Sequence, residues 1–275
     1  MMFFRYLLKI PVKKIMKKYR PLTIGVTGSF NKTSAAGAIY TIIRQLRGQV
    51  RLSSEIADYT KSIYLAVIGA SANSRWWKVF WQALKLIFKE DKNYPGTLVL
   101  EVGAVKPGEI GELAEIIPFD IAVITGINPE QFGPFANRAE LVKEELSILK
   151  HFEGQAKIVV LNGDDEELKK IKNQLKARVV TYGEAEDNDY QFTDKKIIEK
   201  NGSLGTIFKL HYRGRTVPVF LPGIFGLQVY ACFAALAFAE ALYSNILEAI
   251  DALYMYRPEP ERTNLIAGIK EINLD

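Results

Sequence analysis

Short apolar runs alternate with helix-like stretches along most of the chain. The runs that share an apolar, strand-like composition are residues 22–26, 97–103, 121–125, 157–161 and 179–182. Segments with helical spacing occur between and after them, at residues 35–46, 76–88, 139–151, 226–243 and 246–254. Strands that alternate with helices predict an α/β fold with a mainly parallel sheet, flanked by helices and joined by right-handed crossovers.

Three segments depart from this alternation. Residues 190–220 change to short alternating runs with turns at Asn201-Gly202 and Arg213-Gly214, which predicts a small antiparallel addition. Residues 62–70 are apolar and β-branched, and a break follows at residues 71–74. The helix-like residues 76–88 carry an unusual number of aromatic side chains; we favour a core or partner-interface role for them, with a membrane-contacting face as the alternative.

Length and composition fit a single large domain with short additions. A chain of 275 residues can bury a sizeable core, and 48% hydrophobic with 24% charged residues is typical of a soluble globular protein. We divide it into a basic amphipathic segment (1–20), a central domain (21–256), and a connector with a β-prone tail (257–275). The single cysteine, Cys232, excludes a disulfide framework, and no run is apolar enough to cross a bilayer, so we expect a cytoplasmic protein.

The positive charge is concentrated at the start of the chain. Residues 1–21 hold seven of the Lys and Arg residues and no acid, interleaved with apolar side chains. Such a segment suits peripheral contact with the anionic inner face of the membrane. The alternative is a helix that packs on the domain with its lysines in solvent, and Pro11 is expected to interrupt any long helix here. No nucleic-acid recognition module accompanies the charge, so nucleic acid is not an expected partner.

Residues 23–34 read T-I-G-V-T-G-S-F-N-K-T-S, a strand that passes through a polar loop into a helix. Backbone N–H groups, a helix N-terminus, the Lys32 ammonium and the Thr33 hydroxyl are the groups that bind a polyphosphate and its Mg²⁺. The generic phosphate-loop pattern would need glycine at positions 26 and 31, where this chain has Val26 and Asn31. Asparagine enters the left-handed backbone region readily, so the loop can still close. The alternative is an ordinary strand-to-helix turn with a solvated lysine.

Other polar residues fall at the carboxyl ends of further predicted strands. They are Glu101, residues 125–131 and residues 162–165. In a parallel sheet these ends lie along one edge, where ligands bind. The sequence therefore predicts one shared site formed by these residues and the loop at 27–33.

Several motifs resemble those of the Mur ligase family, which are ATP-dependent enzymes of peptidoglycan precursor synthesis. T-G-S-x-x-K-T is similar to the family's T-G-[ST]-x-G-K-T loop. Residues 98–110, which read L-V-L-E-V-G-A-V-K-P-G-E-I, resemble a segment of the family branch that adds D-alanyl-D-alanine. Residues 121–131 and 159–165 resemble shorter segments of the same branch. The resemblance covers roughly residues 21–268.

The resemblance implies an acid–amino acid ligase that uses ATP and Mg²⁺ to form an amide through an acyl phosphate. It assigns catalytic roles to Lys32, Glu101 and Lys143, the last of which is carbamylated in many family members. The implied metal ligands are Thr33, Glu101 and Gln131. The implied nucleotide-binding residues are Thr27, Gly28, Ser29, Asn31, Lys32, Thr33, Ser34 and Asn162.

Departures from the family pattern leave two functions open. Gln131 replaces a histidine, Phe225-Gly226 replaces His-Asn, and Val229 replaces a further asparagine. The family also has a UDP-binding domain before this region and a C-terminal domain after it. We therefore expect one of two functions. The first is a ligase core that acts on a UDP-MurNAc-peptide or related precursor with a C-terminal domain supplied by a separate polypeptide or a longer reading frame. The second is a non-catalytic, degenerate ligase domain that acts as a nucleotide-binding or scaffold module. A generic phosphate-loop nucleotidase explains residues 23–34 but not residues 98–110.

Overall fold

The structure of the protein is a computed structural model that describes residues 2–53, 58–127, 134–152, 154–243 and 245–258. Its strands join into one sheet in the order β2-β3-β1-β4-β5-β6-β7-β8-β9. The strands are β1 (Leu22–Thr27), β2 (Val50–Leu52), β3 (Thr97–Glu101), β4 (Ile121–Ile124), β5 (Gly154–Asn162), β6 (Ala177–Gly183), β7 (Tyr190–Lys200), β8 (Ser203–Tyr212) and β9 (Arg215–Pro222). All pairs from β2 to β7 are parallel, whereas β7, β8 and β9 pair antiparallel, which confirms the predicted fold class.

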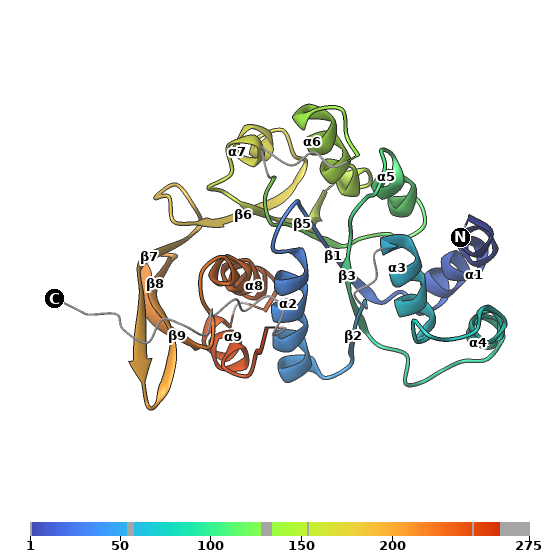
Figure 1. Ribbon diagram of the computed structural model, residues 1–275, viewed down its shortest axis with the longest axis horizontal. Coiled ribbons are helices and arrows are strands. Elements are labelled where there is room, and N and C mark those ends of the chain that lie inside the picture. Colours follow the sequence, from blue (N-terminus) through green and yellow to red (C-terminus); the bar gives the residue numbers. More distant parts are fainter. Residues whose placement is uncertain (1, 54–57, 128–133, 153, 244, 259–275) are drawn as a thin grey trace.

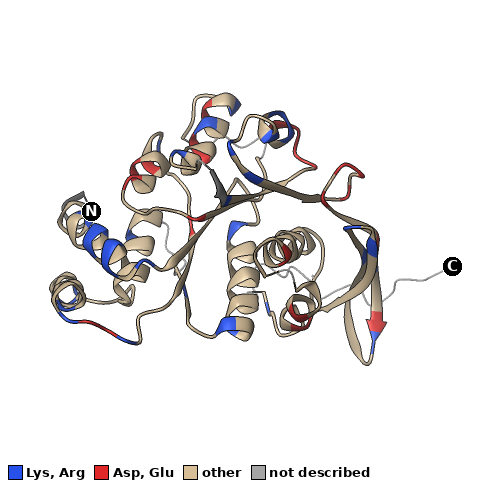
Figure 2. Cartoon of the chain, turned by 180° about the vertical axis from the view of Figure 1, so that it is seen from behind, with Lys and Arg blue, Asp and Glu red and all other residues tan. Residues whose placement is uncertain are grey.

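Helices cover both faces of the sheet (Figure 1). On one face lie α2 (Lys32–Arg47), α8 (Gln228–Tyr243) and α9 (Ile246–Leu253), and on the other lie α1 (Met2–Tyr19), α3 (Tyr59–Ile68), α4 (Trp76–Phe88), α5 (Glu109–Ala114), α6 (Arg138–Leu146) with a short 3-10 turn (Ser147–Leu149), and α7 (Glu166–Lys172). The view from behind in Figure 2 shows the same two layers. Each face has its own cluster of buried apolar side chains, because a parallel sheet buries both of its sides.

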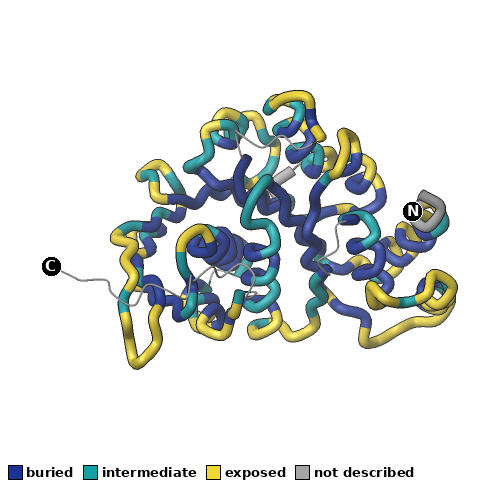
Figure 3. The backbone as a smooth tube through the Cα atoms, in the orientation of Figure 1, coloured by how far each residue is buried: buried dark blue, intermediate teal, exposed yellow. Residues whose placement is uncertain are grey.

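The most buried element apart from the central strands is α8. It is apolar around its whole circumference, and Figure 3 shows it enclosed by α2, α9 and the sheet. The Phe233 ring stacks on Phe192 of β7 at 3.7 Å between centroids and meets Phe208 of β8 edge-on at 4.9 Å. These ring contacts attach the antiparallel strands to the helical layer, so the predicted small addition is part of the same core.

The turns of the antiparallel strands form as the sequence predicts. Asn201 and Gly202 both have positive φ, as do Arg213 and Gly214. Two consecutive residues of this kind match the right-handed twist of the strands that they connect.

One expectation about the first half of the chain needs correction. Pro11 does not interrupt the N-terminal helix, because α1 continues through it from Met2 to Tyr19 while Leu8, Val12 and Ile15 are fully buried against the domain. The apolar, β-branched residues 62–70, to which the sequence assigned no element, lie largely in α3. The Asp58 carboxylate caps this helix at the Lys61 N–H (2.9 Å) and Gly69 ends it in the left-handed conformation, so end signals and burial outweigh propensity.

None of the helices in the described part of the chain is long and apolar enough to span a bilayer. The predicted tail at residues 257–275 is described only as far as residue 258, so its predicted β structure lies outside the described residues.

Removal of the Phe233 ring should destabilise the whole domain. We expect Phe233→Ala to lower the free energy of unfolding by about 3–5 kcal/mol, because the cavity would lie between the helical layer and the strands β7 and β8. Urea unfolding followed by circular dichroism measures this loss. Leu247→Ala at an exposed position of α9 is the control, and an equal loss in the two variants would contradict the proposed coupling.

Candidate nucleotide-binding site

The loop between β1 and α2 has the backbone geometry of a tight anion-binding turn. Gly28 has a φ of 128°, and a Cβ atom there would lie 2.5 Å from the Thr125 hydroxyl, so only glycine fits. Asn31 takes the left-handed conformation (φ 59°) at the position immediately before α2. Asparagine thus performs the backbone role for which the generic pattern uses glycine, and α2 begins with its free N–H groups at the loop.

Lys32 and Thr33 form the first turn of α2 and meet Glu101 at the end of β3. The Thr33 hydroxyl donates a hydrogen bond of 2.8 Å to the Glu101 carboxylate, which is buried. The Lys32 ammonium donates to the Gly28 carbonyl at 2.6 Å and lies over the Tyr59 ring at 5.7 Å. The structure therefore places an ammonium, a hydroxyl and a carboxylate at one strand end, as the sequence predicts.

A second carboxylate, Glu145 of α6, reaches the same loop. It accepts hydrogen bonds from the Gly28 N–H at 3.0 Å and from the Thr27 hydroxyl. Burial raises the pKa of this carboxyl group, while the positive charge of Lys32 and these two hydrogen bonds oppose the rise. The Glu145 carboxylate therefore holds Thr27 and Gly28, the first residues of the loop, in position from inside the protein.

Glu145 is the site residue that the sequence analysis missed. Its neighbour Glu144 is also buried, and accepts hydrogen bonds from the Gly108 and Ile110 N–H groups, each at 2.7 Å. The available signal was the position of the two acids in the helical pattern. Glu144 and Glu145 follow the buried Leu141 by three and four residues, so they lie on the same, inward face of α6, where acids need hydrogen-bond partners. Lys143, the residue for which a catalytic role was predicted, is exposed on α6, and no hydrogen bond or ion pair of the described residues joins it to Lys32, Thr33 or Glu101.

Polar groups after β4 and β5 support the loop from the other side. The Thr125 hydroxyl donates to the Phe30 carbonyl at 2.5 Å, and the Gly126 carbonyl accepts from the Ser29 N–H at 2.7 Å. Asn162 donates from its side chain to the Thr125 carbonyl at 3.0 Å. Asn162 therefore lies beside the loop, where its side chain joins the ends of β4 and β5; its predicted contact with a nucleotide stays a prediction.

The remaining predicted residues divide into three groups. The Asn31 side chain donates to the Leu227 carbonyl at 2.9 Å, and the Ser34 carbonyl accepts from the Tyr256 hydroxyl at 3.0 Å, so both tie the loop to the segments around α8 and α9. The Ser29 hydroxyl is buried and has no hydrogen-bond partner among the described residues. Gln131, the predicted third metal ligand, lies outside the described residues.

The residues present fit a Mg²⁺-bound triphosphate. Two neighbouring oxygen ligands of an octahedral Mg²⁺ are separated by about 3 Å, given bonds of about 2.0–2.1 Å, and the Thr33 and Glu101 oxygens are 2.8 Å apart. The orphaned Ser29 hydroxyl supplies a further group for a phosphate oxygen. Among the described residues there is no group of three or more His, Cys, Asp or Glu side chains that could hold a metal.

A mainly parallel sheet, a left-handed turn before α2, and a Lys-Thr pair beside a strand-end carboxylate define an α/β domain of the phosphate-loop class. Within that class the chain belongs to the Mur ligase family, because the sequence model of the family's middle domain matches residues 26–239. This finding confirms the resemblance drawn from the motifs.

Curated relatives and solved structures agree with this family. The chain is 25% identical over 227 residues to the UDP-N-acetylmuramoyl-tripeptide--D-alanyl-D-alanine ligase of Bacillus subtilis, which covers 82% of this chain and 42% of the relative. It is 27% identical over 162 residues to the UDP-N-acetylmuramoyl-L-alanyl-D-glutamate--2,6-diaminopimelate ligase of Chlamydia caviae, covering 59% of this chain and 32% of the relative. The chain thus spans less than half the length of these relatives.

The structural comparisons show the same fold. MurF from Acinetobacter baumannii superposes with a TM-score of 0.73 at 20% identity, over 92% of this chain and 49% of the other. MurF ligase from Thermotoga maritima, solved in complex with ADP, has a TM-score of 0.68 at 23% identity, over 94% and 53%. Folylpolyglutamate synthase from Mycobacterium tuberculosis, also complexed with ADP, has a TM-score of 0.61 at 16% identity, over 91% and 62%.

The charge of Glu145 should reduce stability at neutral pH. Because burial raises its pKa in the folded state, the native protein binds a proton more readily than the unfolded chain, and stability from this group falls as pH rises from the unfolded pKa through the folded one. Glu145→Gln removes this dependence. We expect the variant to gain melting temperature over the parent at pH 8 and to gain less, or nothing, at pH 5.

Thermal unfolding of the parent, Glu145→Gln and the exposed-site control Glu112→Gln at both pH values measures the effect. A gain of the same size at pH 5 and pH 8 would show that the carboxylate charge is not the cause, and so would an equal pH-dependent gain in Glu112→Gln.

Proposed function

We propose that this domain binds Mg-ATP and serves as the nucleotide-binding core of an acid–amino acid ligase of peptidoglycan precursor synthesis. The observation that carries the proposal is the Thr33–Glu101 pair, 2.8 Å apart, directly beside the Lys32 ammonium at the N-terminus of α2. The D-alanyl-D-alanine and diaminopimelate ligases among the curated relatives support the reaction class. The ADP complexes among the similar structures support ATP as the nucleotide.

Each residue has a defined task in this proposal. The N–H groups at the start of α2 and the Ser29 hydroxyl bind phosphate oxygens, and Lys32 leaves the Gly28 carbonyl to neutralise the transferred phosphoryl group. Thr33 and Glu101 hold Mg²⁺, which supplies charge neutralisation between the phosphates. A substrate carboxylate attacks the γ-phosphorus of ATP, so that ADP leaves and an acyl phosphate forms. An amine then attacks the carbonyl carbon, inorganic phosphate leaves, and the amine nitrogen loses a proton to give the amide. Lys143 and Gln131 remain proposed contributors to a second Mg²⁺.

The substrate and partners follow from the same family. We propose a UDP-MurNAc-peptide or a related cell-wall precursor as the carboxylate substrate, and a separate C-terminal ligase domain as the part that brings the amine. ATP and nucleotide-linked precursors are cytoplasmic compounds, which places the proposed reaction in the cytoplasm. Peripheral contact with the inner face of the membrane rests on the surface of α1 and α4 described below. The DNA downstream of codon 275 tests the partner: a reading frame for such a domain would support a ligase, and its absence would support a scaffold.

Mg-dependent ATP binding should depend on Lys32. We expect measurable binding by isothermal titration calorimetry in the parent and a loss of roughly 10- to 150-fold in affinity for Lys32→Ala, since a charge-assisted contact to phosphate contributes about 1.5–3 kcal/mol. The matched control is Lys196→Ala on the exposed side of β7. Equal affinities in the parent and Lys32→Ala would remove the proposed nucleotide site.

Glu101 should matter only when Mg²⁺ is present. We expect Glu101→Gln to weaken Mg-ATP binding at least about tenfold and to leave ATP binding in EDTA nearly unchanged, because a neutral amide is a poorer ligand for a hard cation. Titration of ATP in Mg²⁺ and in EDTA separates the two effects. A loss of equal size in both buffers would assign Glu101 to folding of the loop instead of to the metal.

A further inference from the structure

The end of the molecule formed by α1 and α4 exposes large apolar side chains. Trp77, Trp81 and Phe88 of α4 are 42%, 65% and 84% exposed and follow one another at intervals of four and seven residues, so they form one stripe along that helix. On α1, Tyr6 and Ile10 are 84% and 66% exposed and are also four residues apart. Exposed residues of this size, gathered on two adjacent helices, exceed the scattered apolar residues that a soluble surface usually carries.

The two helices are fixed to each other and to the domain, so this surface is preformed. The Lys18 ammonium at the end of α1 donates to three backbone carbonyls at the end of α4, those of Leu86 (2.8 Å), Ile87 (3.1 Å) and Lys89 (3.0 Å). Cations near a helix C-terminus also interact favourably with its dipole. Figures 1 and 2 both place α1 and α4 side by side at the end of the molecule opposite β7, β8 and β9.

The charged residues of α1 and α4 are all basic, and the nearest acids, Glu90 and Asp91, follow directly after α4. Residues 1–21 and 75–89 together contain eleven Lys and Arg residues and no Asp or Glu. Figure 2 shows the positive residues along α1. Elsewhere in the described chain many lysines pair with carboxylates, for example Lys150 with Glu115 at 2.6 Å and Lys209 with Asp194 at 2.7 Å, but no ion pair among the described residues involves α1 or α4. The positive charge of this end therefore exceeds the negative charge of Glu90 and Asp91.

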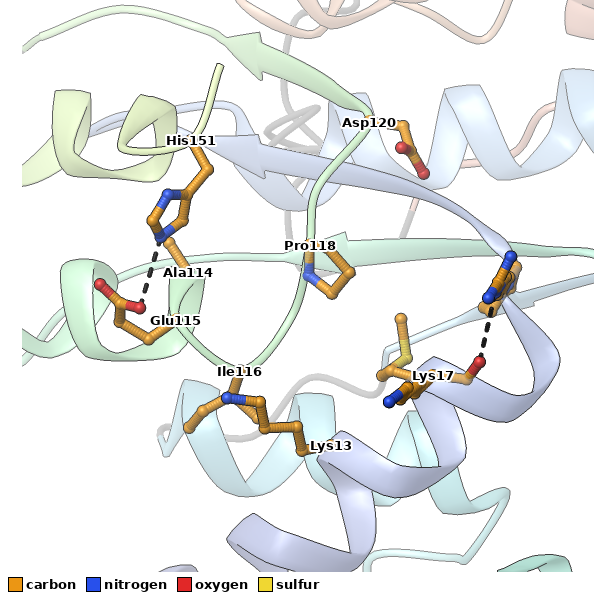
Figure 4. Close-up of a pocket in the computed structure, with 11 residues that line it drawn as sticks. Lys13, Lys17, Ala114, Glu115, Ile116, Pro118, Asp120 and His151 are labelled. Atoms are coloured by element: carbon orange, nitrogen blue, oxygen red, sulfur yellow. Dashed lines mark hydrogen bonds and ion pairs between the residues drawn. The ribbon is translucent and has the colours of Figure 1, made fainter. Parts of the chain in front are cut away.

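A cavity of about 510 Å³ extends the same exposed face of α1. Lys13 and Lys17 line it together with Arg20, and Figure 4 shows it between α1 and the turn that leads from α5 to β4. The two acids in its wall are already neutralised: Glu115 pairs with Lys150 and with His151 at 3.4 Å, and Asp120 pairs with Lys157 at 3.1 Å. The cavity thus offers three cations above an apolar floor that includes Met16, Ile116 and Pro118.

We propose that α1 and α4 form a docking surface for a membrane that contains anionic phospholipids. Tryptophan and tyrosine prefer the interface between head groups and acyl chains, and lysines whose stems lie along apolar surface hold their ammonium groups at the level of lipid phosphates. The cavity at Lys13, Lys17 and Arg20 receives the phosphate of one head group. A second copy of this chain would bring like charges together across a two-fold interface, which disfavours self-association as the role of this surface.

This surface also leaves the nucleotide-binding loop accessible. The loop follows the carboxyl end of β1, whereas the cavity of the docking surface is lined by Arg20 and Pro21, which precede the start of β1, and by Asp120, which precedes the start of β4. Lipid binding and Mg-ATP binding can therefore be measured independently, and the docking proposal does not depend on the proposed ligase function.

Vesicle co-sedimentation of the purified chain tests the proposal. We expect the protein to bind vesicles of phosphatidylcholine with added phosphatidylglycerol, to bind pure phosphatidylcholine at least about tenfold more weakly, and to dissociate as salt is raised. The double variant Lys13→Glu/Lys17→Glu should lose at least about tenfold in binding to the anionic vesicles, since each cation near such a surface contributes roughly fivefold. The double variant Trp81→Ser/Phe88→Ser should lose binding while it keeps its charge.

Matched controls lie at the opposite end of the sheet. Lys196→Glu/Lys200→Glu makes the same change in net charge, and Ile197→Ser/Leu204→Ser removes exposed apolar side chains from β7 and β8. Both should bind as the parent does, and circular dichroism establishes that every variant is folded. The proposal would be overturned if the parent sedimented equally with and without anionic vesicles, or if the controls lost as much as the α1 and α4 variants. Sedimentation velocity that gave a dimer abolished by Trp81→Ser/Phe88→Ser, without vesicle binding, would also overturn it.

Discussion

The parallel pairing of β1 with β3 and β4 determines where every group of the candidate site lies. Its register aligns Val26 with Glu101 and Thr27 with Ile124, so the three strands end at one level. The loop that follows Thr27 must then turn beside the Glu101 carboxylate, and the polar residues after β4 meet it from the other side. A shift of the register would separate Thr33 from Glu101, although neither residue would have changed.

The loop itself depends on a balance between a buried carboxylate and a partly buried ammonium group. Glu145 brings a negative charge to the Gly28 N–H and the Thr27 hydroxyl, and Lys32 brings a positive charge to the Gly28 carbonyl. Removing either charge from water without the other would cost free energy. Together, and with their hydrogen bonds to the loop, the two charges stabilise the loop conformation. A bound triphosphate would change this balance, since it would compete with Glu145 for the positive charge of Lys32. This arrangement links loop stability to the protonation of a residue on α6, which is distant in sequence.

The two ends of the sheet are specialised in different ways. At one end the antiparallel strands β7, β8 and β9 are held by aromatic contacts with α8, which makes them part of the core. At the other end α1 and α4 cover the apolar core with one face and leave aromatic and basic side chains on the other. Pro11 is tolerated within α1 because burial of the neighbouring apolar residues compensates for the hydrogen bond that proline cannot make.

The sequence by itself determined the fold class, the antiparallel addition with its two turns, and the loop with Lys32 and Thr33, because periodicity, turn residues and a local motif are all properties of neighbouring residues. It also indicated that Glu101 follows a strand end. It failed at Pro11, where burial outweighs local preference, and it assigned no element to residues 62–70. Only the tertiary structure decided that Glu145 bonds the loop, that Lys18 caps α4, and that the basic and aromatic segments lie side by side. These contacts join residues far apart in the chain, and they depend on how the helices pack on the sheet, which no local pattern specifies.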